Sequence, residues 1–137
     1  MNLYKDTLMD HFRSPKFKFE GNNHNKTKDG VNPSCGDTIT LYVDMLENSI
    51  KNISFTGNGC AISMASADIM CEVITNIDNS LEGINMFLDY INGDDAIIFP
   101  PKLEVLKIFG ELQQYPVRRN CAILPWKTLK SLLTEQS

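Results

Sequence analysis

The chain has 137 residues, of which 42% are hydrophobic, and it carries a formal net charge of -4 with a sequence pI of about 5.1. A chain of this size and composition can bury a core, so we expect a single domain that spans residues 1–137. The acidic charge argues against binding to nucleic acid or to an anionic membrane, so proteins are the expected partners.

The sequence contains no apolar run of the roughly 20 residues that a membrane-spanning helix requires. Charged residues also interrupt the first twelve positions, where a signal peptide would be apolar. We therefore expect a cytoplasmic protein. Its four cysteines are then expected to be reduced, which favours metal binding or thiol chemistry over a disulfide framework.

The first half of the chain predicts one helix followed by strands. Apolar residues at helical spacing predict an amphipathic helix over residues 2–13, in which we interpret His11 as solvent-facing rather than catalytic. Residues 16–30 are polar and predict a loop with at most one irregular edge strand. Apolar and polar residues alternate over 37–45, and a second apolar run covers 50–55, so this pair predicts an antiparallel hairpin.

The second half of the chain predicts helices. Their expected ranges are about 60–74, 80–91, 103–109 and 122–133. Between the last two we expect a connection over residues 113–120 that bends at Pro116. Pro125 is compatible with the last helix because it would fall in the first turn.

Three separated cysteines and one aspartate form the candidate site: Cys35, Asp37, Cys60 and Cys121. Three thiolates and a carboxylate make a complete tetrahedral zinc site if the fold brings them together. Cys35 and Asp37 flank a glycine, and residues two apart project to one face of an extended segment. Cys60 and Cys121 stand at predicted helix starts, where backbone amides lower a thiol pKa. Spacing alone leaves independent buried thiols open as the alternative.

The fourth cysteine, Cys71, is expected to be structural. It follows Cys60 by eleven residues, which is about 16 Å along a helix, so the two cannot share an ion within one straight helix. We therefore predict a buried thiol. The Gly57-x-Gly59 pattern before Cys60 lacks the Lys-Ser/Thr pair of a phosphate-binding loop, so we interpret it as a turn that lets the cysteine approach a metal.

Four motifs along almost the whole chain resemble the IscU/NifU amino-terminal family of iron-sulfur assembly proteins, and the SufU branch in particular. They are Leu3-Tyr4-Lys5 with Met9-Asp10-His11-Phe12, Asn32-Pro33-Ser34-Cys35-Gly36-Asp37, Gly59-Cys60-Ala61-Ile62-Ser63-Met64-Ala65-Ser66-Ala67, and Cys121-Ala122-Ile123-Leu124-Pro125-Trp126. The resemblance implies an α+β, SufE/IscU-like two-layer fold. Its small antiparallel sheet would have about three strands, with helices on one face and the three cysteines at one exposed end.

Two branches of this family differ around the third cysteine. IscU scaffolds carry a histidine directly before it and a Leu-Pro-Pro-Val-Lys chaperone-recognition segment upstream, whereas this chain has Asn120 and the stretch 115–119. The SufU branch has an insertion, which residues 78–99 match, and an arginine that Arg118 matches. Its usual lysine before the third cysteine is replaced by Asn120.

The resemblance to SufU implies a zinc-dependent sulfurtransferase. Such a protein takes persulfide sulfur from a SufS-type cysteine desulfurase and passes it to downstream iron-sulfur assembly proteins. Cys35, Asp37, Cys60 and Cys121 would bind the zinc, Cys35 would accept the sulfur, and Arg118 would support the site. We expect a monomer or weak dimer.

Two alternatives remain open. One is an IscU-type scaffold that assembles a [2Fe-2S] cluster on the same residues, which would make the bound ion iron. The other is an interaction domain with an inert structural zinc.

Overall fold

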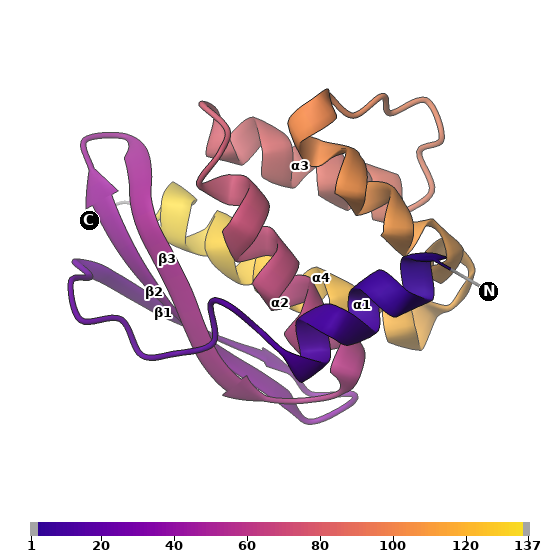
Figure 1. Cartoon of the computed structure of the whole chain (residues 1–137), viewed down its shortest axis with the longest axis horizontal. Helices are drawn as coiled ribbons and strands as arrows, with labels where there is room; N and C mark the ends of the chain where they lie inside the picture. The colour runs from indigo at the N-terminus through magenta and orange to yellow at the C-terminus, as the bar shows by residue number, and fades with distance from the viewer. Residues whose placement is uncertain (1–2, 136–137) are drawn as a thin grey trace.

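The computed structural model describes residues 3–135 and has an α+β architecture. In chain order its elements are α1 (Leu3–Arg13), β1 (Lys26–Asn32), β2 (Asp37–Leu46), β3 (Ser49–Asn58), α2 (Ala61–Ile74), α3 (Ser80–Ile91), the 3-10 helix η1 (Pro101–Gln114) and α4 (Pro116–Thr134). The strands form one antiparallel sheet in the order β1-β2-β3, and the helices lie on one face of it (Figure 1). The expected fold class is confirmed.

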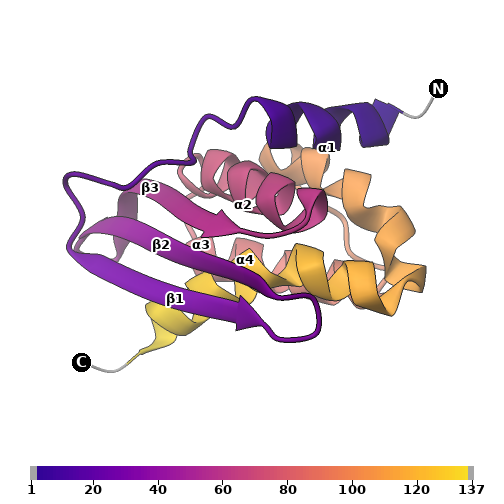
Figure 2. The ribbon, with the colours of Figure 1, turned by 90° about the horizontal axis from the view of Figure 1, so that it is seen from below.

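Helices α2 and α4 form the layer that touches the sheet. α2 packs on β3, whereas α4 packs on β1 and β2. α1 lies on α2 on the side away from the sheet (Figure 2), and α3 and η1 pack against α4. The core therefore lies between the sheet and the α2/α4 pair and continues between that pair and the outer helices.

The hairpin forms where the alternation predicted it. Ile39, Leu41 and Val43 of β2 are almost completely buried and face the helices, and Phe55 of β3 pairs with Leu41. β1 is an edge strand, but it is not irregular: all seven residues pair with β2 in one continuous register, and most of its polar side chains are exposed. Pairing with β2 holds it in place, with Gly30 opposite Ile39.

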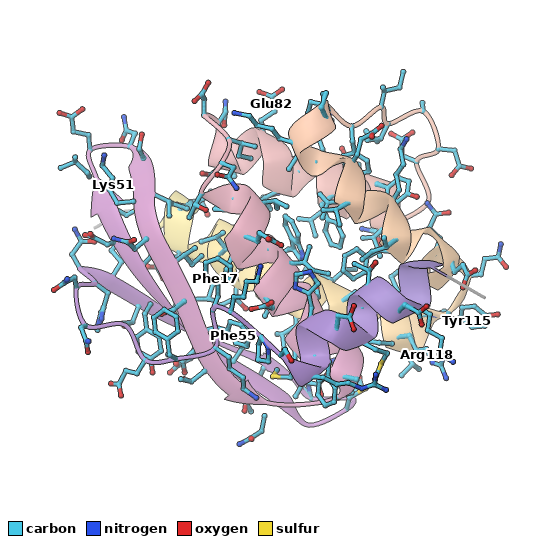
Figure 3. All side chains as sticks on the ribbon, viewed as in Figure 1. Phe17, Lys51, Phe55, Glu82, Tyr115 and Arg118 are labelled. Carbon is cyan, nitrogen blue, oxygen red and sulfur yellow. The ribbon has the colours of Figure 1, made fainter. Side chains whose placement is uncertain are left out.

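The segment after α1 follows β3 before it turns back to β1. The backbone N–H of Phe55 donates to the carbonyl of Phe17 at 2.9 Å, and Figure 3 shows the two side chains near one another beside the sheet. The same figure shows Lys51, at the hairpin end, far from Tyr115 and Arg118 at the opposite end of the molecule. The two ends of the sheet therefore have different surroundings.

Helix η1 is a 3-10 helix because its buried apolar residues recur every three positions. Its buried side chains include Leu103, Leu106, Phe109 and Leu112, each three residues after the last. A 3-10 helix has three residues per turn, so these side chains stack on one face, whereas an α-helix would spread them around its surface. The predicted short helix over 103–109 is thus present, longer than expected and more tightly wound.

The start of the last helix differs from the prediction. Pro116 does not bend a connection over 113–120; it is the first residue of α4, where its fixed φ fits and its missing N–H costs nothing. Cys121 consequently lies in the second turn, and Pro125 lies inside the helix rather than in its first turn. Having no N–H, Pro125 cannot donate to the Cys121 carbonyl four residues earlier.

Within residues 3–135, no helix is both long and apolar enough to cross a membrane.

Candidate metal centre

The four predicted site residues come from four segments that meet at one end of the sheet. Cys35 lies in the turn between β1 and β2, Asp37 is the first residue of β2, Cys60 caps α2, and Cys121 lies in α4. The Sγ atoms of Cys35 and Cys121 and a carboxylate oxygen of Asp37 all lie within 4.8 Å of one another. A single ion could therefore be reached by all three.

Asp37 is the buried anchor of the site. It is 1% exposed, and its Oδ1 accepts the backbone N–H of Cys60 at 3.0 Å. Its Oδ2 is buried and has no hydrogen-bond partner. A buried carboxylate oxygen without a partner is costly, and a coordinated cation would remove that cost.

Gly59 allows the Asp37 side chain to lie against the backbone between β3 and α2. A Cβ at this position would lie 2.7 Å from Asp37 Oδ1 and 2.6 Å from Ser63 Oγ, both closer than side chains tolerate. Glycine therefore lets β3 turn into α2 against the carboxylate without displacing Asp37 or Ser63.

Cys121 is buried, and its thiol is the centre of a hydrogen-bond network. It donates to Cys35 Sγ at 3.6 Å and accepts from Asn32 Nδ2 at 3.9 Å. Burial, followed by hydrogen bonds with Cys60, Cys35 and Asp37, raises its pKa far above the ordinary value. The lowered pKa expected from a helix start is therefore wrong for this residue, because Cys121 stands in the second turn and not at the N-terminus of α4. It keeps its proton unless a positive charge is added.

Cys60 occupies the predicted helix start. It is the N-cap of α2, and its Sγ accepts the Ser63 N–H at 3.4 Å. Its sulfur is not one of the three mutually close ligand atoms, although a hydrogen bond with it contributes to the raised pKa of Cys121. The structure thus brings Cys35, Asp37 and Cys121 together directly and joins Cys60 to them through its backbone N–H and this contact.

Two supporting residues were not singled out from the sequence. Asn32 is 8% exposed and donates to Cys121, and Ser63 contacts Cys60 through its backbone and its hydroxyl. Ser63 stands three residues after Cys60, which is the spacing between an N-cap side chain and the amide that it caps, so that signal was available. The contact of Asn32 joins residues 89 apart, and spacing gives no hint of it.

Cys71 lies outside this site. It is fully buried in α2, and burial, with a smaller contribution from the charge of Asp68, raises its pKa well above the ordinary value. The prediction of a buried thiol is confirmed.

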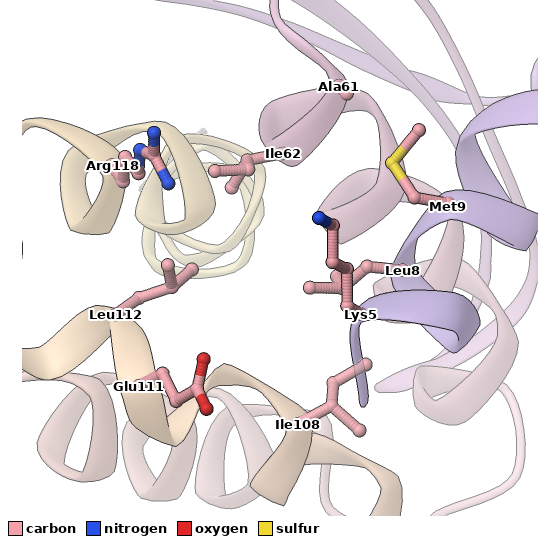
Figure 4. Close-up of a pocket in the computed structure, with 9 residues that line it drawn as sticks. All are labelled: Lys5, Leu8, Met9, Ala61, Ile62, Ile108, Glu111, Leu112 and Arg118. Carbon is pink, nitrogen blue, oxygen red and sulfur yellow. The ribbon is translucent and has the colours of Figure 1, made fainter. Parts of the chain in front are cut away.

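A partly apolar pocket of about 400 Å³ adjoins the site, between α1, the start of α2, the end of η1 and the start of α4. Ala61 and Ile62, which directly follow Cys60, line it, and Arg118 lies beside Ile62 (Figure 4). Figure 4 also shows the Lys5 ammonium directed toward Ile62 and the Glu111 carboxylate on the η1 side. The exposed Arg118 therefore lines a recess beside the site and is not among its ligand atoms.

The model of the NifU-like N terminal domain family matches residues 3–135. The chain belongs to this family. The match extends over all of the described residues, so the site and the scaffold that holds it belong to one family domain.

Two curated relatives of similar length carry different names. The chain is 34% identical to the "Iron-sulfur cluster assembly scaffold protein IscU" of Thermotoga maritima, over 98% of this chain and 95% of the relative. It is also 34% identical to the "Zinc-dependent sulfurtransferase SufU" of Bacillus subtilis, over 93% of this chain and 87% of the relative. Identity does not separate the two.

Solved structures agree with the fold. The protein named FiSufU from Fervidobacterium islandicum AW-1 superposes with a TM-score of 0.80 at 34% identity, covering 94% of this chain and 95% of that one. The N-terminal NifU-like protein of Brucella abortus superposes with a TM-score of 0.81 at 14% identity, covering 96% and 92%, and supports the fold alone. The chain is therefore a member of the iron-sulfur cluster assembly family to which IscU and SufU belong.

Proposed function

We propose that this protein accepts persulfide sulfur from a SufS-type cysteine desulfurase and passes it on to iron-sulfur cluster assembly. Cys35 is the acceptor, and Cys35, Asp37, Cys60 and Cys121 hold a zinc ion. The name and similarity of the Bacillus subtilis relative support this function, as does a donor set of sulfur and carboxylate oxygen, which suits zinc.

One observation carries the metal part of the proposal. The buried Asp37 carboxylate has an oxygen without a partner, and a carboxylate oxygen of Asp37 lies within 4.8 Å of two sulfur atoms. The residues therefore fit a cation in two ways. Their sulfur and oxygen atoms are suitable donors, and among the described residues the buried carboxylate has no ion-pair partner to offset its charge. When bound, zinc supplies the positive charge that keeps such thiols ionised near neutral pH.

Cys35 is the cysteine best placed to meet a partner. It is exposed in a turn held by hydrogen bonds from its own N–H and that of Gly36 to the Asn32 carbonyl, and Gly36 has a φ of 71°. Cys121 is buried, and the Cys60 sulfur is engaged in capping α2. Among the three, the Cys35 side chain can move with the least loss of packing.

The transfer itself is a thiol–disulfide type exchange. The Cys35 thiolate attacks the outer sulfur of the desulfurase persulfide, and a bond forms between these two sulfur atoms. The bond from the outer sulfur to the desulfurase cysteine breaks, and that cysteine leaves as a thiolate. Cys35 becomes the persulfide, so sulfur and electrons balance without an external oxidant or reductant.

The experiment is to incubate the zinc-loaded protein with desulfurase and cysteine, trap persulfides by alkylation and locate them by mass spectrometry. We expect the label at Cys35, its loss in Cys35→Ser and its retention in the matched Cys71→Ser variant. Labelling mainly at Cys60, Cys71 or Cys121, or normal sulfur uptake by Cys35→Ser, would overturn the assignment.

The second candidate is a [2Fe-2S] scaffold that uses the same residues, favoured by the similarity to the Thermotoga maritima relative. Anaerobically purified protein distinguishes the two. Stoichiometric zinc without colour supports sulfur transfer, whereas a brown cluster that the protein hands to an apo-protein supports the scaffold. Stimulation of desulfurase turnover would exclude an inert structural zinc.

A further inference from the structure

A histidine and two carboxylates meet between α1 and α2, outside the candidate metal centre. His11 Nδ1 lies 2.7 Å from Asp68 Oδ2, and His11 Nε2 lies 3.7 Å from Glu72 Oε2. The three side chains line a surface hollow of about 260 Å³. His11 is thus largely buried against α2, so its interpretation as a solvent-facing residue is wrong; its side chain is only 16% exposed because α1 packs on α2.

Asp68 is fixed in place by the fold. It is fully buried, and its Oδ1 accepts the backbone N–H groups of Lys16 and Phe17 at 2.9 and 2.8 Å. Its Oδ2 takes the hydrogen bond from His11. A carboxylate can only accept, so the Nδ1 of His11 carries the proton.

This arrangement decides what Nε2 offers. With the proton on Nδ1, a neutral imidazole has its lone pair on Nε2, and this atom lies 3.7 Å from Glu72 Oε2. A neutral imidazole and the Glu72 carboxylate are then two neighbouring acceptors, and either a proton on Nε2 or a bound cation would offset their repulsion. A separation of 3.7 Å is long for a hydrogen bond but near the roughly 3.4 Å between two ligand atoms on one tetrahedral ion with bonds of about 2.1 Å.

We propose that His11 Nε2 and Glu72 Oε2 form a second, exchangeable site for a divalent cation such as Zn²⁺. Asp68 orients the imidazole through Nδ1, the arrangement that metal-binding histidines commonly have. Nitrogen and oxygen donors suit borderline ions of this kind, and water completes the coordination. Having only two protein ligands, and with the basic residue Lys16 lining the same hollow, this site is weaker than a three-thiolate centre. The ion joins α1 to α2, which cross in Figure 1.

The test uses full-length protein already loaded with one equivalent of zinc, followed by a zinc titration. Nitrogen NMR of the imidazoles reports binding directly, because the chain has two histidines and His24, which lies outside the hollow, serves as the internal control. We expect Nε2 of His11 to shift and saturate while His24 does not respond. Glu72→Gln is expected to weaken this second binding step about tenfold or more.

Glu72→Gln is the decisive variant because it leaves the His11–Asp68 hydrogen bond intact, whereas His11→Ala also removes that link between helices. Glu82→Gln, an exposed helical position on α3, is the matched control and is expected to bind like the parent protein. Two results would overturn the proposal: a His11 signal that does not shift when zinc is added, or equal second-site affinity in Glu72→Gln and the parent protein. Either would show that only a proton lies between His11 Nε2 and Glu72 Oε2. Neither outcome depends on the sulfur-transfer function.

Discussion

At the scale of single residues, the candidate centre depends on groups that are not ligands. The Cys60 N–H fixes one carboxylate oxygen of Asp37 and leaves the other without a partner, as a ligand role requires. Asn32 and Ser63 hold the sulfur atoms of Cys121 and Cys60 in the same way. The geometry of the ligands is thus set by neighbouring hydrogen bonds and by the absence of a side chain at Gly59.

Replacing Gly59 by alanine tests this dependence. The added methyl group would meet Asp37 Oδ1 and Ser63 Oγ, so Asp37 must move, and we expect zinc affinity to fall about tenfold or more. Gly93→Ala is the matched control: it sits at φ 110° with open space around it, so it should cost about 1 kcal/mol of stability and leave zinc binding unchanged. Competition with a chelator measures both affinities, and equal affinities in the two variants would contradict the role of Gly59.

At the scale of elements, the sequence predicted correctly those segments whose residue pattern is compatible with only one secondary structure. Alternation predicted β2, an apolar run predicted β3, and apolar residues at helical spacing predicted α3. The Asn79 side chain caps α3 by accepting the Glu82 N–H. Cys60 was recognised as a helix start because small and apolar residues follow it without interruption. Short-range sequence patterns determine these elements, so they can be predicted from a single sequence.

The start of α4 was predicted wrongly because its sequence is compatible with two structures. A proline such as Pro116 can end one segment or begin the next, and only the packing of α4 decides between them. Moving that start from 122 to 116 placed Pro125 inside the helix and Cys121 in the second turn. The meeting of the four site segments could be expected only through the family resemblance, because their spacing contains no compact metal-binding motif.

Helix α2 provides a test at this scale through its buried thiol. Burial and the charge of Asp68 raise the pKa of Cys71 in the folded protein above its value in the unfolded chain. The stabilising effect of the protonated thiol is complete below the unfolded pKa of about 8.5 and is lost as pH rises beyond it, since only the unfolded chain then ionises. Each pH unit should cost up to about 1.4 kcal/mol.

Urea unfolding of zinc-loaded protein between pH 7 and 10 measures this loss. Cys71→Ala is expected to be less stable at pH 7 because it removes buried atoms, but its free energy of unfolding should fall less steeply above pH 8.5. Parallel pH profiles for the two proteins would refute the assignment of this alkaline loss to Cys71.

At the scale of the whole molecule, the candidate centre lies where three parts of the fold that already pack on one another meet. The β1–β2 turn, the junction of β3 with α2, and α4 come together at one end of the sheet, and each carries at least one of the four candidate ligands. A metal ion at this point restrains the position of α4 relative to the sheet edge. Metal binding should therefore stabilise the fold as a whole and not only the local turn.

Removing the metal measures that contribution. Free zinc at 100 times its dissociation constant stabilises a folded protein by about 2.7 kcal/mol, which for a chain of this length corresponds to roughly 10 °C in Tm.

We expect Cys60→Ala and Cys121→Ala to lose zinc and to melt like the chelator-treated parent protein. Asp37→Ala should lose less affinity, because water can take the open position. Cys71→Ser is the control and should keep its zinc and its response to chelator. Calorimetry with and without chelator, together with metal analysis, reports both effects; stoichiometric zinc in both Cys60→Ala and Cys121→Ala would refute the four-residue site.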